Sequence, residues 1–509
     1  MKPTKEQEEI LKAVKSEVGI IKINAFAGTG KTTTLNMIAK QNPSKKILYL
    51  AFNKSIAAEA KEKFPKNVTV KTVHALAYYN IVVLRGYKNV RGNYKSVEIA
   101  EEFDVDISVA KRALMLFENF CNSALDFELP SFFLNIEEDN EPAKIAYALY
   151  EKMRQKEMPI THSFYLKEFE LSLKERPRLK YDMILLDEAQ DTNDVTLSVF
   201  YLLKSPKKIL VGDRHQQIYS FRGSINAMNK VKAKVFNLTA SFRFNDAIAK
   251  KANSLLSVLK GEKNKLKGLG GNGDFESFAY ISRTNASLIE KIATKEKDET
   301  FKTVRDPYSI FALALNVLDL LDGKPLDKGF EYLGYITDTA KRRGDMLKVL
   351  GEFAAESEDV ELKSTLSLID NYGKSIRNFY DLAVRFWEIE KPDFYLSTAH
   401  TSKGLEFSEV ELCDDFYVLE KISDYFFESE IYPDGGDFIR RMRKEKLPQP
   451  VTDEINLFYV AVTRAKNRVT GGEILEKLND EQLFYRYANR EIKEIFDIKV
   501  KMSKTVLKN

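Results

Sequence analysis

The segment NAFAGTGKTTTL, residues 24–35, constrains the fold of this chain more than any other stretch. It follows GIIKINA, which is typical of a short buried strand, and it runs into TTTLNMIAK, which is typical of a helix. A glycine-rich turn between a strand and a helix indicates a phosphate-binding loop, because glycine lets backbone N–H groups approach phosphate oxygens. The alternative is a chance glycine-rich turn, against which the flanking strand and helix argue.

Within such a loop we expect each position to serve the binding of ATP and Mg²⁺. Gly28 and Gly30 would bring backbone N–H groups to the phosphates. Lys31 would reach the β and γ oxygens, and the Thr32 hydroxyl would be a Mg²⁺ ligand. The other candidate ATP-binding positions of the segment are Ala27, Thr29 and Thr33.

A second segment, YDMILLDEAQD at residues 181–191, supplies paired carboxylates at the end of an apolar strand. Asp187 is placed to hold Mg²⁺ through water, and Glu188 to orient and deprotonate the attacking water. A solvated acidic turn is the alternative for this segment taken alone. Together with the phosphate-binding loop, the pair indicates hydrolysis of a nucleoside triphosphate.

The length and the strand pattern predict more than one domain. A chain of 509 residues exceeds the roughly 250–300 residues at which single cores stop growing. Short apolar runs alternate with helical stretches, which predicts an α/β fold of two RecA-like, doubly wound parallel-sheet lobes, each with an inserted and mainly helical subdomain. The expected boundaries are 1–85 and 169–236 for the first lobe, 86–168 for its insertion, 237–300 and 392–509 for the second lobe, and 301–391 for its insertion.

Composition excludes several classes of protein. The 79 Lys and Arg against 75 Asp and Glu give a net charge of only +4, so a nucleic-acid site must be a local groove. We find neither an apolar run of about 18 residues nor a secretion signal, so we expect a cytoplasmic protein without membrane contact. Cys121 and Cys413 lie far apart, which argues against a disulfide framework or a metal cluster.

Six further segments follow one another in a characteristic order: TKEQ (4–7), VGDRHQQIYSFRGS (211–224), TASFRFN (239–245), AYISRTNA (279–286), STAHTSKGLEF (397–407) and LFYVAVTRAK (457–466). With them the sequence resembles superfamily 1 DNA helicases of the UvrD/Rep type. AFAGTGKTTTL, YLAFNKSIAAEAKEKFP and TVHALAY are most similar to the helicase part of F-box DNA helicases. The resemblance covers nearly all of the chain.

The resemblance implies roles around the nucleotide for particular residues. Gln7 would hydrogen-bond adenine, Phe242 would stack on it, and Glu406 would face the ribose. Gln216 would sense the γ-phosphate, which Arg243 and Arg464 would also contact, while Arg283 would lie near the cleft. The family usually has tyrosine where this chain has Phe242. An arginine supplied from outside the phosphate-loop domain can be worth ~10³ to 10⁵ in the rate of phosphoryl transfer.

A motor that moves along a single strand needs aromatic rings for the bases and polar groups for the phosphates. Candidate rings are Phe52 and Tyr78, for which burial in the core is the alternative, and candidate backbone contacts are Asn53, Lys54, Thr72 and His74. The resemblance adds Phe221, Arg222, Thr398, His400 and Ser402.

We therefore expect an ATP-dependent translocase and helicase that acts as a monomer on single-stranded DNA and on junctions of single-stranded and duplex DNA. The resemblance implies movement from 3′ to 5′ and a role in repair or recombination. Two alternatives remain: a nucleotide-gated regulatory module that unwinds nothing, and a motor directed to RNA, since recognition of the 2′-hydroxyl cannot be read from these residues.

Overall fold

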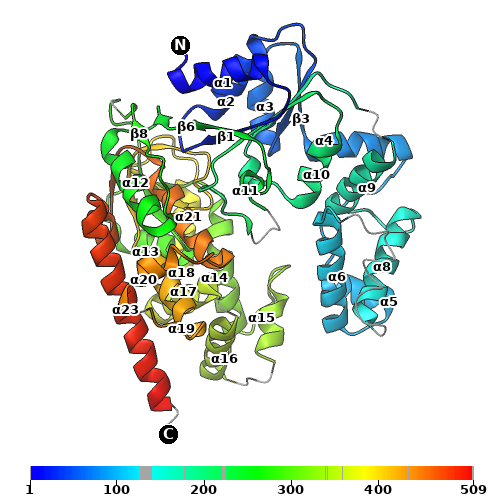
Figure 1. Cartoon of the computed structure of the whole chain (residues 1–509). Coiled ribbons are helices and arrows are strands. Elements are labelled where there is room, and N and C mark those ends of the chain that lie inside the picture. The colour runs from blue at the N-terminus through cyan, green and yellow to red at the C-terminus, as the bar shows by residue number, and fades with distance from the viewer. Residues whose placement is uncertain are drawn as a thin grey trace. The chain divides into compact units, whose positions relative to one another are not determined.

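The computed structural model describes residues 2–125, 140–176, 179–220, 225–271, 273–338, 340, 342–357, 359–433 and 436–506. The chain forms two compact units, Met1–Leu238 and Thr239–Asn509 (Figure 1). Each unit contains a parallel sheet with helices packed against it. The predicted α/β class with two doubly wound lobes is confirmed.

The sheet of unit 1 has six parallel strands in the order β3-β2-β4-β5-β1-β6. The strands are β1 (Gly19–Ala25), β2 (Ile47–Ala51), β3 (Val68–Thr72), β4 (Met183–Leu186), β5 (Lys207–Gly212) and β6 (Lys234–Leu238). Strand β5 lies between β1 and β4, and all three run in the same direction. The loops that follow these strands therefore leave the same edge of the sheet.

Successive residues of the central strands belong to two different cores. In β2, Ile47 and Tyr49 pack with helices α1 (Lys5–Ser16), α2 (Lys31–Lys40) and α3 (Lys54–Lys63). Leu48 and Leu50 pack into a second core on the opposite face. Side chains alternate between the faces of a strand, so a strand that is apolar at every position must be covered by helices on both sides.

The helices inserted in unit 1 share that second core with the sheet. The chain passes from α4 (Val73–Ala77) into the π-helical turn η1 (Tyr78–Val83), and a 3₁₀ turn, η2 (Ala189–Asp191), follows β4. The other helices of unit 1 are α5 (Ser96–Phe103), α6 (Ile107–Asn122), α8 (Glu141–Arg154), α9 (His162–Glu175), α10 (Asp194–Leu202) and α11 (Ala227–Lys230). Figure 1 shows α5, α6 and α8 together at the end of unit 1 away from α1. Helix α9 runs across the expected boundary at 168/169, because its buried face continues from Phe164 to Leu173.

The sheet of unit 2 has five parallel strands in the order β10-β11-β9-β12-β13. They are β9 (Phe278–Ser282), β10 (Phe301–Thr303), β11 (Phe394–Thr398), β12 (Phe407–Leu412) and β13 (Ala465–Thr470), and a separate short ladder joins β7 (Ala240–Ser241) to β8 (Lys267–Gly268). Strand β10 pairs with β11, although we expected a helical insertion from residue 301. The sheet therefore extends two residues past the start predicted for that insertion, to Thr303.

The helices of unit 2 are α12 (Asp246–Lys260), α13 (Asn285–Thr294), α14 (Pro307–Leu321), α15 (Glu331–Ile336), α16 (Arg343–Glu356), α17 (Val360–Tyr372), α18 (Ser375–Phe386), α19 (Val418–Glu428), α20 (Phe438–Met442), α21 (Gln449–Val462), α22 (Glu473–Lys477) and α23 (Glu481–Val506). The inserted helices α14, α16 and α17 share one core with α13 and with β11. Among the residues that the structure describes, none of the helices combines the length and the apolarity needed to cross a bilayer.

Candidate functional site

The predicted phosphate-binding loop lies between β1 and α2, as its sequence indicates. Gly28 and Gly30 have φ angles of 70° and 78°, in the left-handed region that glycine adopts without strain. Thr29 is buried, and its hydroxyl donates to the carbonyl of Phe26 at 2.8 Å. Ala27 is also buried, whereas Thr33 is exposed. The loop is thus closed by its own contacts and leads into the N-terminus of α2, where helix N–H groups favour an anion.

Asp187, at the end of β4, accepts hydrogen bonds from two side-chain hydroxyls of the site. Its Oδ2 accepts hydrogen bonds from the Thr32 hydroxyl at 3.1 Å and from the Tyr49 hydroxyl at 2.5 Å. Burial and then the neighbouring Glu188 raise the pKa of Asp187 above its ordinary value. The two predicted Mg²⁺ ligands, Thr32 and Asp187, are thus adjacent, and hydroxyl and carboxylate oxygens are donors that suit Mg²⁺.

Tyr49 was not predicted as a site residue. It lies within an apolar strand, and its side chain is completely buried. Its hydroxyl is the only polar side-chain group of this strand, and a buried tyrosine hydroxyl needs a partner.

Glu188 adopts a left-handed backbone conformation, with φ of 50°, that is unusual for a residue with a side chain. Its carboxylate lies 3.3 Å from the Lys31 Nζ, so the two residues predicted to act on the γ-phosphate and on water are in contact. Gln190 donates to Glu188 Oε2 at 2.6 Å. Backbone strain of this kind is concentrated at functional sites.

The loop after β5 joins the same network. The backbone N–H of Asp213 donates to Gln190 Oε1 at 3.0 Å, and the Gln216 amide donates to Asp213 Oδ2 at 2.9 Å. A Cβ on Gly212 would lie 2.4 Å from Gln190 Oε1, so a larger residue there would have to displace the Gln190 amide. Gln216, the predicted γ-phosphate sensor, is thereby linked through Asp213 and Gln190 to Glu188.

Gln7 lies beside the start of α2. Its Nε2 donates to Thr34 Oγ1 at 3.0 Å, while its Oε1 accepts from the backbone of Thr4 in the cap of α1. The predicted adenine-reading residue is therefore next to the phosphate-binding helix, with its amide already held in one orientation.

In unit 2 the two predicted arginines meet at one residue. Arg243 Nη1 donates to the carbonyl of Thr463 at 3.2 Å, and Arg464 Nη2 donates to the Thr463 hydroxyl at 3.3 Å. Arg464 is completely buried and also donates to the carbonyls of Val460 and Leu405.

Glu406, the predicted ribose contact, belongs to the same group. It pairs with the Arg243 Nε at 3.0 Å and lies near Lys466. Partial burial opposes ionisation of Glu406, but Arg243 and Lys466 outweigh it and lower its pKa. Phe242 is 40% exposed, which leaves a ring face for stacking. The structure thus brings Phe242, Arg243, Glu406 and Arg464 together within unit 2.

The glycine-rich segment KGLGGNGDF, residues 267–275, had no predicted role. Its backbone packs directly on the segment that carries Phe242 and Arg243, and the N–H of Gly270 donates to the carbonyl of Phe244 at 3.1 Å. A Cβ on Gly270 would lie 2.1 Å from the carbonyl oxygen of Phe242. Gly268 and Gly271 likewise leave no room for a Cβ beside neighbouring backbone atoms, so glycine at these three positions is needed for the close approach.

Several candidate strand contacts of unit 1 are at the surface. Phe52 is 40% exposed and stacks on Tyr219 with ring centroids 6.1 Å apart. Lys54, His74 and Tyr78 are exposed. Tyr219 was missed by the sequence reasoning, although it stands two residues before Phe221 in a segment already singled out. Phe221 and Arg222 themselves lie outside the described residues.

Asn53 and Thr72 have a local structural task. Asn53 Oδ1 accepts from the N–H of Ile56 and caps α3, and Thr72 Oγ1 accepts from the N–H of Ala75 and caps α4. Asn53 is exposed, whereas Thr72 is buried. Their predicted contacts with a strand stay predictions.

In unit 2, Thr398 and His400 border a pocket of about 200 Å³ together with Arg283, Asn285 and Arg305. Asn285 and Arg305 are further candidates that the sequence reasoning missed. Arg283 is held by Glu454 at 2.8 Å. Ser402 is completely buried, and its hydroxyl donates to the carbonyl of Ala399 in the turn after β11, so its predicted contact with a strand stays a prediction.

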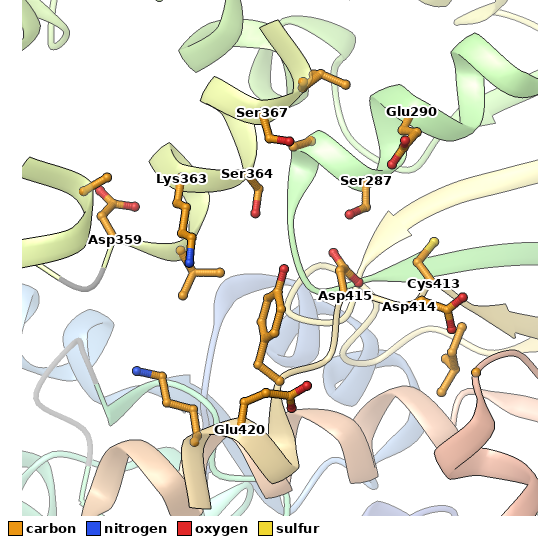
Figure 2. Close-up of a pocket in the computed structure, with 18 of the residues that line it drawn as sticks. Ser287, Glu290, Asp359, Lys363, Ser364, Ser367, Cys413, Asp414, Asp415 and Glu420 are labelled. Atoms are coloured by element: carbon orange, nitrogen blue, oxygen red, sulfur yellow. The ribbon is translucent and has the colours of Figure 1, made fainter. Parts of the chain in front are cut away.

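Another hollow of unit 2, about 1170 Å³, lies elsewhere (Figure 2). It is lined by α13, α17, α19 and the end of β12, and none of the predicted site residues that the structure describes borders it. Carboxylates such as Glu290, Asp414 and Glu420 outnumber lysines on its wall. A negative wall repels phosphate, so this hollow does not suit a nucleotide or a nucleic-acid strand.

Comparisons with known proteins show that the chain is similar to DNA helicases. Residues 5–235 match the UvrD/REP helicase N-terminal domain. The chain is 31% identical to F-box DNA helicase 1 of Gallus gallus over 523 residues, covering 94% of this chain and 50% of that protein. It is 29% identical to F-box DNA helicase protein 1 of Schizosaccharomyces pombe over 542 residues, covering 93% and 58%. It is 24% identical to a probable DNA helicase II homolog of Mycoplasma genitalium over 624 residues, covering 96% and 88%. The chain therefore spans about half the length of the two F-box relatives.

Proposed function

Since residues 5–235 of the chain belong to the UvrD/REP helicase family, we propose that the protein is an ATP-dependent motor that translocates along single-stranded DNA and separates duplexes. We further propose movement from 3′ to 5′, action as a monomer at junctions of single-stranded and duplex DNA, and a role in repair or recombination. The direction rests on the resemblance of TSKGLEF, residues 401–407, to the corresponding segment of the family.

One observation carries this proposal. At the edge of the unit 1 sheet, Thr32 lies 3.1 Å from Asp187 and Lys31 lies 3.3 Å from Glu188. These are the four groups that phosphoryl transfer to water needs: a hydroxyl and a carboxylate for Mg²⁺, a cation for the phosphates and a carboxylate for the water. Residues of a merely regulatory nucleotide site would not need Glu188 in this position.

The residues divide the chemistry between them. Thr32 and Asp187 would hold Mg²⁺, which when bound neutralises phosphate charge. Glu188 would accept the proton of the attacking water, and the left-handed backbone fixes the direction of its side chain. In unit 2, Arg243 and Arg464 would stabilise the charge that develops on the γ-phosphate.

The first test measures ATP hydrolysis with and without single-stranded DNA. We expect strong stimulation by DNA, which weakens as salt is raised because phosphate contacts are lost. Glu188→Gln should abolish hydrolysis while keeping the size of the side chain, and the exposed Glu59→Gln should leave it unchanged. A rate that ignores DNA would favour the regulatory alternative.

The second test concerns direction and substrate. Duplexes with either a 3′ or a 5′ single-stranded tail are incubated with the protein and ATP, and strand separation is measured. Preference for the 5′ tail would refute the proposed direction. Equal competition by RNA and DNA strands of the same length would refute the preference for DNA.

A further inference from the structure

A cluster of four rings joins the RecA-like part of unit 1 to its inserted helices. His74 and Tyr78 come from α4 and the start of η1, and His162 and Tyr165 come from the first turn of α9. Tyr165 is the centre of the cluster: its ring centroid lies 6.0 Å from that of His74, 5.9 Å from that of Tyr78 and 5.6 Å from that of His162. All three contacts are edge-to-face, with interplanar angles of 86° to 89°.

The four rings differ in their exposure to solvent. Tyr165 is buried, whereas His74, Tyr78 and His162 are exposed. An edge-to-face contact uses one edge or one face of each ring, so an exposed ring keeps an open face. The cluster therefore consists of three solvent-exposed rings that all pack against one buried tyrosine.

His162 is fixed in this arrangement by a polar contact. Its Nδ1 lies 3.0 Å from the Tyr165 hydroxyl, which leaves Nε2 on the other side of the imidazole ring. The rings of His162 and His74 also contact each other, with centroids 6.5 Å apart. An exposed histidine that is held at one nitrogen presents its other nitrogen in a defined direction.

The backbone around the cluster favours an anion. Helix α9 begins at His162 and has 14 residues, so the positive end of its dipole lies beside the rings. On the other side, the chain leaves α4 through the π-helical turn η1, and Tyr79 of that turn is 58% exposed. Short π-helical segments occur frequently at functional sites.

We propose that His162, positioned by Tyr165, forms with His74 and Tyr78 one binding site for neighbouring nucleotides of single-stranded DNA. The open ring faces would stack on bases, and the imidazole nitrogens with the start of α9 would contact the phosphates. His74 and Tyr78 were already candidates from the sequence, whereas His162 and Tyr165 assign part of the strand path to the inserted helices. This inference rests on the proposed function and makes it more specific.

The site suits a nucleic-acid strand better than a protein partner. A protein interface of this kind would need a wider apolar surface, whereas here two of the three exposed rings are imidazoles beside a helix N-terminus. Stacking together with phosphate contacts is the pattern by which strands are bound without regard to base sequence.

The test is the equilibrium binding of a fluorescein-labelled oligothymidylate to the full chain, followed by anisotropy. His162→Ala should weaken binding about 5-fold to 150-fold, the range expected from losing one base-stacking contact. Tyr165→Phe keeps the central ring and removes the hydroxyl, so it should weaken binding in the same direction and less. The control is Tyr201→Ala, which removes a 44% exposed ring of α10 outside the cluster and should bind as the wild type does.

Two further readouts separate this inference from the proposed function. The DNA concentration for half-maximal ATPase stimulation should rise by the same factor in His162→Ala. A strand that contains 5-iodouracil should crosslink to the peptide that carries His162. If wild-type ATPase responds to DNA but His162→Ala binds within 2-fold of the wild type and no such crosslink forms, the inference is refuted and the proposed function stands. If the wild type binds no DNA, both fail.

Discussion

Replacing Tyr49 by phenylalanine tests whether the hydrogen bond to Asp187 serves catalysis. The substitution removes only the hydroxyl that donates to Asp187 Oδ2 at 2.5 Å, and it keeps the ring packed on Phe64 with centroids 4.7 Å apart. Asp187 would retain the Thr32 hydroxyl and the N–H of Glu188 as donors. The perturbation is therefore confined to one donor of a buried carboxylate.

The magnitude follows from the charge and burial of the acceptor. A hydrogen bond to a charged group contributes about 1.5–3 kcal/mol, so we expect the free energy of unfolding to fall by that amount. If the bond also orients Asp187 during hydrolysis, a loss of about 1.4 kcal/mol in the transition state would lower kcat about tenfold. We expect KM for MgATP to change by less than about 2-fold, because the residues that contact the phosphates are untouched.

A second buried tyrosine provides the matched control. The Tyr150 hydroxyl donates to Glu168 Oε1 at 2.7 Å within the inserted helices, and its side chain is also completely buried. Tyr150→Phe should cost similar stability in urea denaturation and leave steady-state ATPase unchanged. If Tyr49→Phe loses stability to the same extent and keeps full kcat, the bond to Asp187 is only structural and the reasoning is wrong.

Three other substitutions give separate expectations. Gly270→Ala would place a Cβ 2.1 Å from the carbonyl oxygen of Phe242, so it should lower the melting temperature by several degrees and raise KM for ATP; an unchanged KM would contradict the role given to this loop. Asp415→Asn sets an NH₂ group against donors from Arg283 and Thr284, at 2.8 Å each, and should cost about 1–3 kcal/mol in urea denaturation, whereas an unaffected midpoint would show that the loop needs no carboxylate. Burial raises the pKa of Glu361 from its ordinary 4.5, so the folded state holds this proton more tightly and wild-type stability falls as the pH rises above 4.5. Glu361→Gln should therefore gain stability relative to the wild type over that range, and parallel pH profiles would refute the assignment.

The sequence predicted those parts of the molecule that depend on local pattern. The strand before the phosphate-binding loop and the helix after it lie where GIIKINA and TTTLNMIAK place them, because β-branched residues and glycines act over a few positions. The same holds for MILL before Asp187. Since the loops after parallel strands leave one edge of a sheet, the meeting of Thr32 with Asp187 also follows from the pattern.

Features that depend on packing across the chain were not predictable. Tyr49 reads as one more apolar strand residue, and only its register beside β4 brings it to Asp187. Ser402 carries a hydroxyl in a functional segment, but the turn after β11 directs it inward. Gly270 acquires a reason only from the backbone of Phe242, and Gly268 only from the backbone of Asn245, both of which are more than 20 residues earlier in the sequence.

The continuous core between the inserted helices of unit 1 and one face of the sheet has a mechanical consequence. Helix α9 packs against α10, the helix that follows the loop of Asp187 and Glu188. A force applied at His162 would therefore be transmitted through α9 and α10 toward the loop that carries Asp187 and Glu188. Deleting the inserted helices would expose the apolar residues of the sheet that they cover, so we expect the truncated unit to unfold or aggregate.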